Sequence, residues 1–506
     1  MIRITAFLFA VLFLTSSSAF GEGPDRTKLP GPSGETQWAI PNVEQWSLKN
    51  GIQIWLLEQD QAPLISMRLI TSHGAGTDPA EKAGLAALMV DMLDEGAGSY
   101  DALSLSDAFQ MLATDYRAGA TDNGLSFSLE MLVDNLVPSL ELLKQILRHP
   151  TLPEQEFKRL KAQRLAAALA DEAELISGAS RVRKRALFGQ GYGGHAAGGV
   201  RGTLEKISYE DIKGQYKALV QPEGATIVVV GNITKSKLNE ALEAKLGDWV
   251  GKATAPDRPL EAQKEIPAVH FVDFPGSAQS VVMMARPAPA DGAADHFPAL
   301  VFNRPFSGSF TGRVNMNLRE DKGYSYGARG AFARNRHAGA FIVYAKVKGD
   351  TTRASIDEMI KELSDIRGER PLSAQEIQEA KSGLRKSFPG RFEQMSHVAN
   401  MLQDLALSGR SPDWYQDWPE KVKAVDLATA QATAQVYTAP ESFAIVVAGD
   451  WSKIGESIKG LNRPIVTYDA QGNRMKTPGP EKTESIDEKA KKVKKKKTKR
   501  PKKTRK

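Results

Sequence analysis

The chain has 506 residues, of which 41% are apolar and 25% are charged, so its composition is close to the average of globular proteins. These values exclude a fully disordered chain and a polytopic membrane protein, and the length predicts two or three domains. The sequence contains no cysteine, which excludes a disulfide framework, a lipid-modified cysteine and a thiolate metal site.

The N-terminus has the order of a secretory signal peptide. A basic residue, Arg3, precedes a mostly apolar run at Ile4–Leu14, and small or neutral residues follow as far as Gly21. Cleavage after Ala19 and cleavage after Gly21 both fit this pattern. The apolar run is too short to span a bilayer, and a helix that stays attached as a tether is the alternative interpretation. We therefore expect residues 1–21 to be removed on export, and the mature protein to be periplasmic or secreted in a bacterium.

The mature chain is expected to begin with a leader at residues 22–41, in which glycine and proline favour extended backbone. Two strand-like pieces then flank an Asn-Gly pair at 50–51 within Trp46–Glu58, which predicts a β-hairpin. A further apolar, β-branched run covers Pro63–Thr71. The pattern changes to the helical period at Gly84–Glu95, where large apolar side chains share one face: Leu85, Leu88, Met89, Met92 and Leu93.

The second half of the chain repeats landmarks of the first half. One apolar strand ends at Gly231 and another at Gly449, and a proline stands at the same distance before each glycine. Charged helical stretches open at Leu152 and at Leu372, which are separated by almost the same length of chain as the two glycines. Because two independent landmarks keep nearly one offset, we infer a tandem duplication.

Each repeat contains hairpins, a pair of helices with charged faces and a terminal apolar strand. This combination predicts an α+β fold of two homologous domains, each a mostly antiparallel sheet covered by helices. We place the first repeat at residues 42–253 and the second at residues 269–465. The linker between them, residues 254–268, contains prolines that break regular elements.

Residues 466–506 are predicted to form a disordered, lysine-rich tail. Of the 67 basic residues, 13 lie in Lys489–Lys506, which has no acidic residue, so 54 basic residues face 60 acidic ones in the remainder. The body of the protein is therefore mildly acidic, while the tail cannot bury apolar area. The tail either binds an anionic envelope surface or is a solvated segment without a specific partner. Nucleic acid is not favoured, because the run has no aromatic residue to stack on bases.

Motifs of a self-sufficient enzyme are absent from the sequence. The seven histidines are far apart, so a zinc site would have to assemble from distant single residues. A nucleophile elbow, a P-loop and a strand-linked dinucleotide-binding motif are also missing.

One segment nevertheless resembles part of a known family. Gly76–Gly96 is similar to the segment of the pitrilysin/insulinase metallopeptidases, including mitochondrial processing peptidase, that carries the inverted zinc motif H-x-x-E-H on a helix. In that motif two histidines bind zinc and the glutamate activates water. The corresponding positions are Ala87, Val90 and Asp91, and one carboxylate cannot hold zinc alone. The resemblance therefore implies a family member without its own metal site.

The family's further glutamate ligand would fall in the helix after Phe157, near Ala166 or Ala167. This position is also apolar, and only a shift of register would bring Glu172 or Glu174 to it.

The resemblance extends over residues 43–462 and includes His195–Thr203, which is similar to a histidine- and glycine-containing stretch of the family. Its most specific part is Ser307–Tyr326, similar to the family's glycine-rich turn and helix followed by Arg-Glu and Gly-x-x-Tyr. By motif position, Arg319 and Tyr326 match an arginine and a tyrosine that help to hold the substrate backbone across the cavity from zinc. A guanidinium and a phenol can both donate to a peptide carbonyl.

Each of these residues also has a structural interpretation. Without the resemblance, Arg319 would be a helix-surface salt-bridge residue and Tyr326 a strand residue that packs on the core. Gly308, Ser309 and Phe310 either line the cavity as part of a flexible gate or form a tight turn before the helix, and the turn is the favoured interpretation.

Together these observations predict the non-catalytic, substrate-binding subunit of a heterodimeric zinc metallopeptidase that acts on peptides in the cell envelope. The resemblance implies a sister subunit that bears H-x-x-E-H and holds the zinc, while this chain binds no cofactor. One alternative is a catalytically inactive scaffold of the same fold, as in the core subunits of respiratory complexes. The other is an envelope-binding module that acts through the basic tail.

Overall fold

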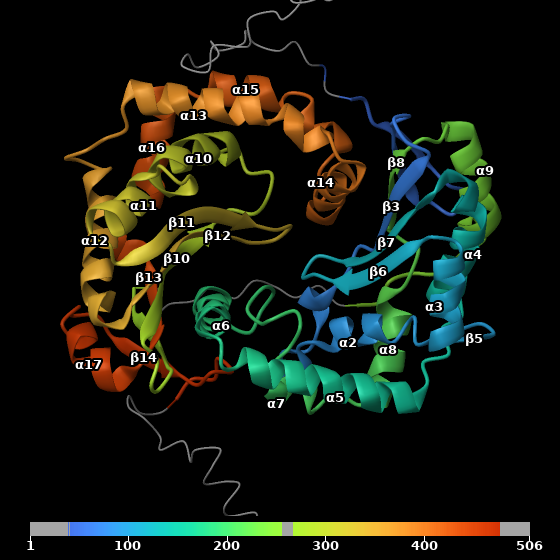
Figure 1. The fold of residues 1–506 in the computed structure, drawn as a ribbon, viewed down its shortest axis with the longest axis horizontal. Coiled ribbons are helices and arrows are strands. Elements are labelled where there is room, and N and C mark those ends of the chain that lie inside the picture. Colours follow the sequence, from blue (N-terminus) through green and yellow to red (C-terminus); the bar gives the residue numbers. More distant parts are fainter. Residues whose placement is uncertain (1–38, 40, 256–266, 476–506) are drawn as a thin grey trace, which may run out of the picture. The chain divides into compact units, whose positions relative to one another are not determined.

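The computed structural model describes residues 39, 41–255 and 267–475 (Figure 1). Residues 41–255 and 267–475 belong to one compact unit. The predicted signal peptide, nearly all of the leader, most of the linker and the basic run of the tail lie outside the described residues. No helix in the described part is long and apolar enough to cross a membrane.

The first half of the chain forms a six-stranded sheet in the order β1-β2-β8-β3-β7-β6 (Figure 1). The strands are β1 (Glu44–Ser47), β2 (Gln53–Glu58), β3 (Leu64–Ile70), β6 (Asp115–Ala120), β7 (Leu125–Leu132) and β8 (Thr226–Gly231). Neighbouring strands are antiparallel except β2 and β8. β1 and β2 form the predicted hairpin, and Gly51 in its turn has a φ of 90°, which glycine adopts without strain.

The helix predicted within Gly84–Glu95 is present as α2, the first of the helices in this half. They are α2 (Leu85–Asp91), α3 (Ala102–Met111), α4 (Leu136–Arg148), α5 (Glu154–Asp171), α6 (Leu175–Phe188), α7 (Arg201–Leu204), α8 (Tyr209–Leu219) and α9 (Lys235–Leu246). Shorter 3-10 turns are η1 (Ala75–Thr77), η2 (Ala80–Lys82) and η3 (Val133–Asn135). A two-stranded ribbon pairs β4 (Gly96–Ala97) with β5 (Tyr100–Asp101).

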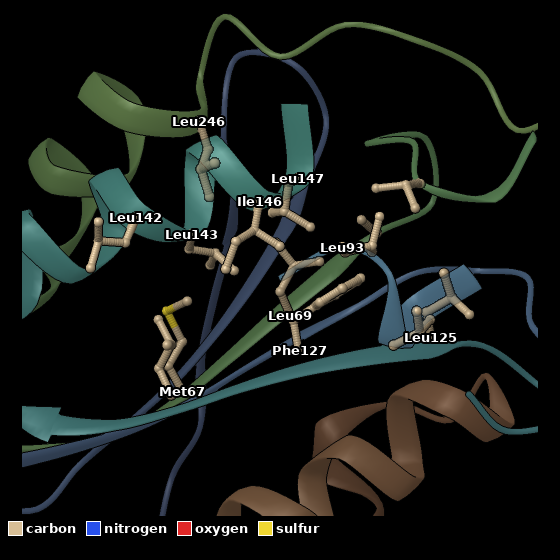
Figure 2. Close-up of a cluster of buried hydrophobic side chains, with 14 of the residues drawn as sticks. Met67, Leu69, Leu93, Leu125, Phe127, Leu142, Leu143, Ile146, Leu147 and Leu246 are labelled. Atoms are coloured by element: carbon tan, nitrogen blue, oxygen red, sulfur yellow. The ribbon is translucent and has the colours of Figure 1, made fainter. Parts of the chain in front are cut away.

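Alternation along the strands decides which face of the first sheet enters the core. In β7 the apolar residues from Leu125 to Met131 occupy every second position and are buried, while the intervening positions are polar. Phe127 and Met67 pack under α4, which contributes Leu143 and Leu147 (Figure 2). The polar positions of β7 therefore lie on the opposite face of the sheet.

The second half forms another six-stranded sheet, in the order β11-β12-β10-β13-β9-β14. The strands are β9 (Val269–Asp273), β10 (Gln279–Ala288), β11 (Ser325–Arg334), β12 (Gly339–Lys348), β13 (Ala444–Gly449) and β14 (Ile465–Tyr468). The helices are α10 (His296–Asn303), α11 (Arg313–Asn315), α12 (Thr352–Asp365), α13 (Ala374–Ser387), α14 (Met395–Ser408), α15 (Trp418–Ala424), α16 (Leu427–Tyr437) and α17 (Trp451–Lys459). Two π-helical turns are η4 (Arg304–Gly308) and η5 (Met316–Asp321), and 3-10 turns are η6 (Gly349–Thr351), η7 (Pro389–Phe392), η8 (Pro412–Tyr415) and η9 (Pro440–Ser442).

Five of the six strands have the same order and pairing in both sheets, which confirms the duplication. Reading the second sheet backwards pairs β2 with β9, β8 with β13, β3 with β10, β7 with β12 and β6 with β11. Gly231 and Gly449 end the equivalent strands β8 and β13. The step along the chain from the start of α5 to the start of α13 equals the step from α6 to α14. The mixed α+β fold of two repeats is therefore as the sequence predicts.

The edge next to β9 departs from the prediction. The second repeat is predicted to end at residue 465 and the tail to begin at residue 466, but β14 runs through Tyr468 and the described chain continues to Met475. β14 pairs in parallel with β9, whereas its counterpart β1 pairs antiparallel with β2. A strand of 4 residues is too short for an alternating apolar pattern to be recognised in the sequence. In the structure, its residues Val466 and Tyr468 are buried in an apolar cluster.

Each sheet is covered on one face by a helix from the other repeat. α14 packs on β3 and β8 of the first sheet, and α6 packs on β9, β10 and β13 of the second (Figure 1). Under α6, Ala179 and Val182 join an apolar cluster with strand residues of the second sheet. Under α14 the contact is polar, because Arg68 Nε donates to Asn400 Oδ1 at 3.1 Å and Ser126 Oγ donates to Gln403 Oε1 at 2.6 Å.

The hairpin tips of the two repeats also meet. Asn123 at the tip between β6 and β7 accepts from the Tyr192 hydroxyl and, at 3.4 Å, from the Arg336 backbone N–H at the tip between β11 and β12. Arg336 Nη1 donates to Ser72 O at 3.0 Å, and the rings of Tyr192 and His337 meet edge to face at 4.8 Å. These contacts fix the edge strands β6 and β11 relative to each other.

We expect Glu130→Gln to destabilise the fold. Arg68 is 4% exposed and its Nη2 lies 2.7 Å from Glu130 Oε1, so the amide would leave the guanidinium without its counter-charge. The free energy of unfolding, measured by urea titration, should fall by about 1–3 kcal/mol. Arg117→Gln is the control, because its pair with Asp115 is exposed to solvent and should contribute little to stability. Equal effects of the two variants would contradict a role for the buried pair.

Candidate functional site

Helix α2, which carries the three degenerate metal positions, starts at a buried carboxylate. Gly84 precedes the helix with a φ of 96°, and Asp78 accepts hydrogen bonds from the backbone N–H groups of Gly84 and Ala86, both at 3.0 Å. A carboxylate at this end satisfies free N–H groups and complements the helix dipole. The start of α2 is thus held firmly, and with it the position of every side chain on the helix.

The structure places the three degenerate positions in two different surroundings. Ala87 and Val90 are 7% and 1% exposed and belong to the apolar packing of α2. Asp91 is partly exposed and is the last residue of the helix. A methyl group and an isopropyl group therefore stand where a zinc ligand and a water-activating carboxylate would be needed.

The remaining carboxylate is engaged by an arginine. Arg164 on α5 donates from Nε to Asp91 Oδ2 at 2.5 Å and from Nη2 to Ala87 O at 3.0 Å. The guanidinium therefore ties α5 to α2 and brings a positive charge to the carboxylate. A cation bonded to Asp91 competes with a metal ion there, and the residues present do not fit zinc.

The positions considered for a further ligand offer no alternative. Ala166 and Ala167 on α5 are exposed, and the α5 residue that reaches α2 is Arg164. Both carboxylate oxygens of Glu172 accept from the Arg201 guanidinium at 3.2 Å, and Glu174 is exposed at the start of α6. Across residues 41–255 and 267–475, no group of three or more His, Cys, Asp or Glu side chains could hold a metal ion.

Asp94, just beyond α2, is a carboxylate with an unusual protonation equilibrium. Burial raises the pKa of Asp94 to about 6, and the nearby charges of Glu95 and Asp91 act in the same direction, against a hydrogen bond from its own backbone. Glu95 itself pairs with Arg159 at 2.5 Å. The end of α2 is therefore an acidic cluster that two arginines of α5 neutralise in part.

The second candidate region is the segment Ser307–Tyr326. Two π-helical turns, η4 and η5, lie on either side of the glycine-rich turn and α11. π-helical turns are rare and occur frequently at functional sites. No pattern in the sequence predicts them.

Buried amides anchor this segment to strand β11. Asn303 Nδ2 donates to Gly330 O at 2.9 Å and its Oδ1 accepts from Ser307 Oγ at 2.7 Å. A Cβ atom at Gly330 would lie 2.0 Å from Ser307 Oγ, so this strand position requires glycine. Asn315 completes the attachment by donating to Phe310 O at 2.6 Å and accepting from the Ala328 N–H at 2.9 Å.

Turn η5 is held from its other side by α12. Asn317 Nδ2 donates to Glu358 at 3.0 Å and to Glu362 at 2.8 Å, and Lys322 Nζ pairs with Glu358 at 2.9 Å. Burial acts to raise the pKa of Glu358, but the bonds from Lys322 and Asn317 hold it below its ordinary value. Glu358 is thus kept ionised, and it fixes the turn that carries Arg319.

The structure brings Arg319, Tyr326 and Phe310 together. Arg319 Nη1 donates to the backbone carbonyl of Tyr326 at 3.1 Å, and its guanidinium carbon lies 4.6 Å from the centre of the Phe310 ring. Tyr326 is 91% exposed and Phe310 is 53% exposed. The interpretation of Tyr326 as a packed strand residue is therefore wrong. Arg319 also has the surface ion pair of the structural interpretation, with Glu320 at 3.0 Å.

The glycine-rich residues before α11 form the turn that the sequence favours. Ser309 Oγ donates to Arg304 O at 2.9 Å and closes the chain after η4. A Cβ atom at Gly308 would lie 2.9 Å from Asn303 Nδ2, so the turn has no room for a side chain there. Phe310 leaves this turn toward Arg319, which makes it part of the same exposed group.

Comparison with known proteins gives a family assignment. The profile described as Insulinase (Peptidase family M16) matches residues 54–190, and the profile of the peptidase M16 inactive domain matches residues 206–384. The chain belongs to peptidase family M16. Within this family, the non-peptidase homologue YmxG of Helicobacter pylori is 23% identical over 380 residues, which cover 73% of this chain and 85% of that protein.

Solved structures of the M16 fold superpose on both repeats. The peptidase M16 inactive domain from Pseudomonas fluorescens matches with a TM-score of 0.74 and 21% identity over 81% of this chain and 98% of that one. A chain of complex III2 from Candida albicans matches with a TM-score of 0.69 and 15% identity over 83% and 99%. At these identities the likeness shows the fold. Within this family, the three motif positions of α2 hold Ala87, Val90 and Asp91 in place of H-x-x-E-H.

Asp94→Asn should reveal the buried carboxylate as a pH-dependent stability difference. The folded-state pKa of about 6 exceeds the ordinary value of 3.8, so the folded protein binds more protons than the unfolded one between these values. The wild-type free energy of unfolding should therefore fall as pH rises through this window. At pH 7 the variant should be more stable by about 1–3 kcal/mol, with no difference below pH 4. Asp107→Asn, which removes an exposed carboxylate from α3, is the control in urea titrations, and a pH-independent effect of Asp94→Asn would contradict the shift.

Proposed function

We propose that this chain is the non-catalytic, substrate-binding subunit of a heterodimeric zinc metallopeptidase that acts on peptides in the cell envelope. A sister subunit bearing H-x-x-E-H would hold the zinc. The observation that carries the proposal is the contrast between two regions of one fold. At α2 the three motif positions are apolar or paired with Arg164, while Arg319 and Tyr326 are exposed and the Arg319 guanidinium contacts the Tyr326 backbone carbonyl.

The chemistry of the exposed group fits the binding of an extended peptide. Arg319 is an obligate cation, and its remaining N–H groups can donate to a peptide carbonyl. The Tyr326 hydroxyl is exposed and can donate to the same group, where it would stabilise developing negative charge. Neither side chain can activate water as the missing glutamate would. The chain can therefore position a substrate and support its carbonyl, while the hydrolytic step needs the sister's metal.

The names of two similar proteins support the part of the proposal that this chain is non-catalytic. The Helicobacter pylori relative is called a non-peptidase homologue, and the Pseudomonas fluorescens structure is called an inactive domain. The likeness to a chain of complex III2 favours a second candidate function, a scaffold that keeps the fold without binding peptide. The two functions differ in whether Arg319 and Tyr326 affect catalysis.

Peptide cleavage by the reconstituted pair tests the proposal. The chain is co-expressed with an M16 protein that carries H-x-x-E-H, ideally one encoded beside it, and kcat/KM is measured on an unstructured peptide library. Arg319→Ala and Tyr326→Phe should each lower kcat/KM roughly 100-fold, the loss typical of one oxyanion donor. Arg329→Ala and Tyr344→Phe, on the paired strands β11 and β12, are matched controls and should leave kcat/KM unchanged.

The same assay separates the two candidate functions. Full activity of the pair with both substitutions would reject substrate binding and leave the scaffold role. Chelator-sensitive hydrolysis by this chain alone would reject both functions, because it would require a metal site on this chain.

We also propose a periplasmic or secreted location and contact of Lys489–Lys506 with an anionic envelope surface. The support is the predicted signal peptide and the 13 basic residues of Lys489–Lys506, a segment that contains no acidic residue. Deleting residues 489–506 should abolish retention on vesicles that contain anionic lipid at low salt, and retention of the full chain should fall steeply with ionic strength. A chain without the tail that is retained equally well would reject this contact.

A further inference from the structure

We propose that the protein has a binding site for a small oxyanion in a cavity at the histidine- and glycine-containing stretch. The cavity has a volume of about 250 Å³ and lies among α6, the loop that leads to α7, and the segment after β14. We call it the His195 cavity. The proposed peptide-binding function does not involve it, and the inference does not depend on that function.

The side chains around the His195 cavity are mainly cationic. Arg181, Arg185 and Lys206 line it, and Glu81 is the single acidic side chain among the lining residues. Arg181 is already neutralised, because it pairs with Asp171 and donates from Nε to Ala470 O at 2.9 Å. The charges that a ligand meets are therefore those of Arg185 and Lys206, opposed by the single carboxylate of Glu81.

Arg185 and Lys206 are available for a ligand. Arg185 Nη1 lies 3.5 Å from Gly189 O, a long contact, and neither Arg185 nor Lys206 forms an ion pair with another residue of the described ranges. The two side chains reach the cavity from different elements, since Arg185 is in α6 and Lys206 follows α7. Two such cations around one cavity suit an anion that accepts from both at once.

Two glycines and a histidine form one wall of the cavity. Gly194 and Gly199 form part of its wall, and Gly199 has a φ of 77°, which favours glycine. His195 lines the cavity between them, with its Nε2 3.2 Å from Ala75 O. A Cβ atom would lie 2.2 Å from Gly189 O at Gly194 and 2.4 Å from Ala83 O at Gly199, so the close packing of the main chain requires glycine at both positions.

The remaining wall comes from the end of the second repeat, residues 469–475, which we call the C-terminal strap. Gln471 Oε1 accepts from the Gly202 N–H at 2.9 Å, and Gln471, Gly472 and Asn473 line the cavity. The strap is folded on Asp469, which accepts from the N–H groups of Gln471 and Asn473 at 2.9 Å. An anion in the cavity would therefore contact both repeats and stabilise the strap against the first.

The chemistry points to a phosphate-type oxyanion. Its oxygens accept charge-assisted hydrogen bonds from a guanidinium and an ammonium, and the cavity volume admits a phosphate with a few further atoms. Free phosphate and a phosphate ester share this chemistry. Inorganic phosphate and glycerol 3-phosphate are therefore the two probes, and the tighter of the two identifies the source.

Calorimetric titration of the full chain with each probe at low ionic strength tests the site. Arg185→Ala and Lys206→Ala should each weaken binding about 10-fold, as expected for the loss of one charge-assisted hydrogen bond. Lys217→Ala, on the exposed side of α8, is the matched control and should bind like the wild type. Because every variant keeps the lysine-rich tail, binding by the tail is the same in all of them.

A second readout follows the strap itself. Trypsin cleavage after Arg474, followed by mass spectrometry, should slow when phosphate is added to the wild type and should not respond to phosphate in Arg185→Ala. If that variant does not fold, the exposed Lys206→Ala provides the comparison. Equal phosphate affinity in the wild type, Arg185→Ala and Lys206→Ala, or no phosphate binding at all, would overturn the proposal.

Discussion

The two repeats are held together by an exchange of helices. One face of each sheet is covered by a helix of the other repeat. Helix α14, which follows α13, covers the first sheet, and helix α6, which follows α5, covers the second. Strands such as β8 and β13 are buried along nearly their whole length only because both faces are covered. Neither repeat can complete its core alone, so the position of each candidate site depends on the fold of both.

Within this shared core, the two regions that carry chemistry in the M16 family have diverged in different ways. At α2 the positions that correspond to the zinc motif cannot bind metal, since Val90 is packed in the core and Asp91 is bound by Arg164. At η5 buried amides and an ionised Glu358 hold the backbone, while Arg319 and Tyr326 remain exposed.

Much of the fold follows from local patterns in the sequence. The Asn-Gly turn predicts the first hairpin, the helical period predicts α2, and the spacing of Gly231 and Gly449 predicts the duplication. Other features depend on contacts between residues that are far apart in the chain. Arg164 and Asp91 are 73 residues apart, and nothing near either residue indicates the pair. Tyr326 illustrates the same limit, because its strand pattern favours burial and only the resemblance to the family singles it out.

The exchange of helices also has a consequence for the order in which the chain folds. All strands of the first sheet are present once Gly231 has been synthesised, but the helix that covers its second face begins only at Met395, late in the second repeat. Until then Arg68 and Glu130 face solvent on a bare sheet. Contacts of such long sequence separation slow folding and leave partly structured intermediates. A nascent chain of this protein therefore stays incompletely folded until almost all of it has been made.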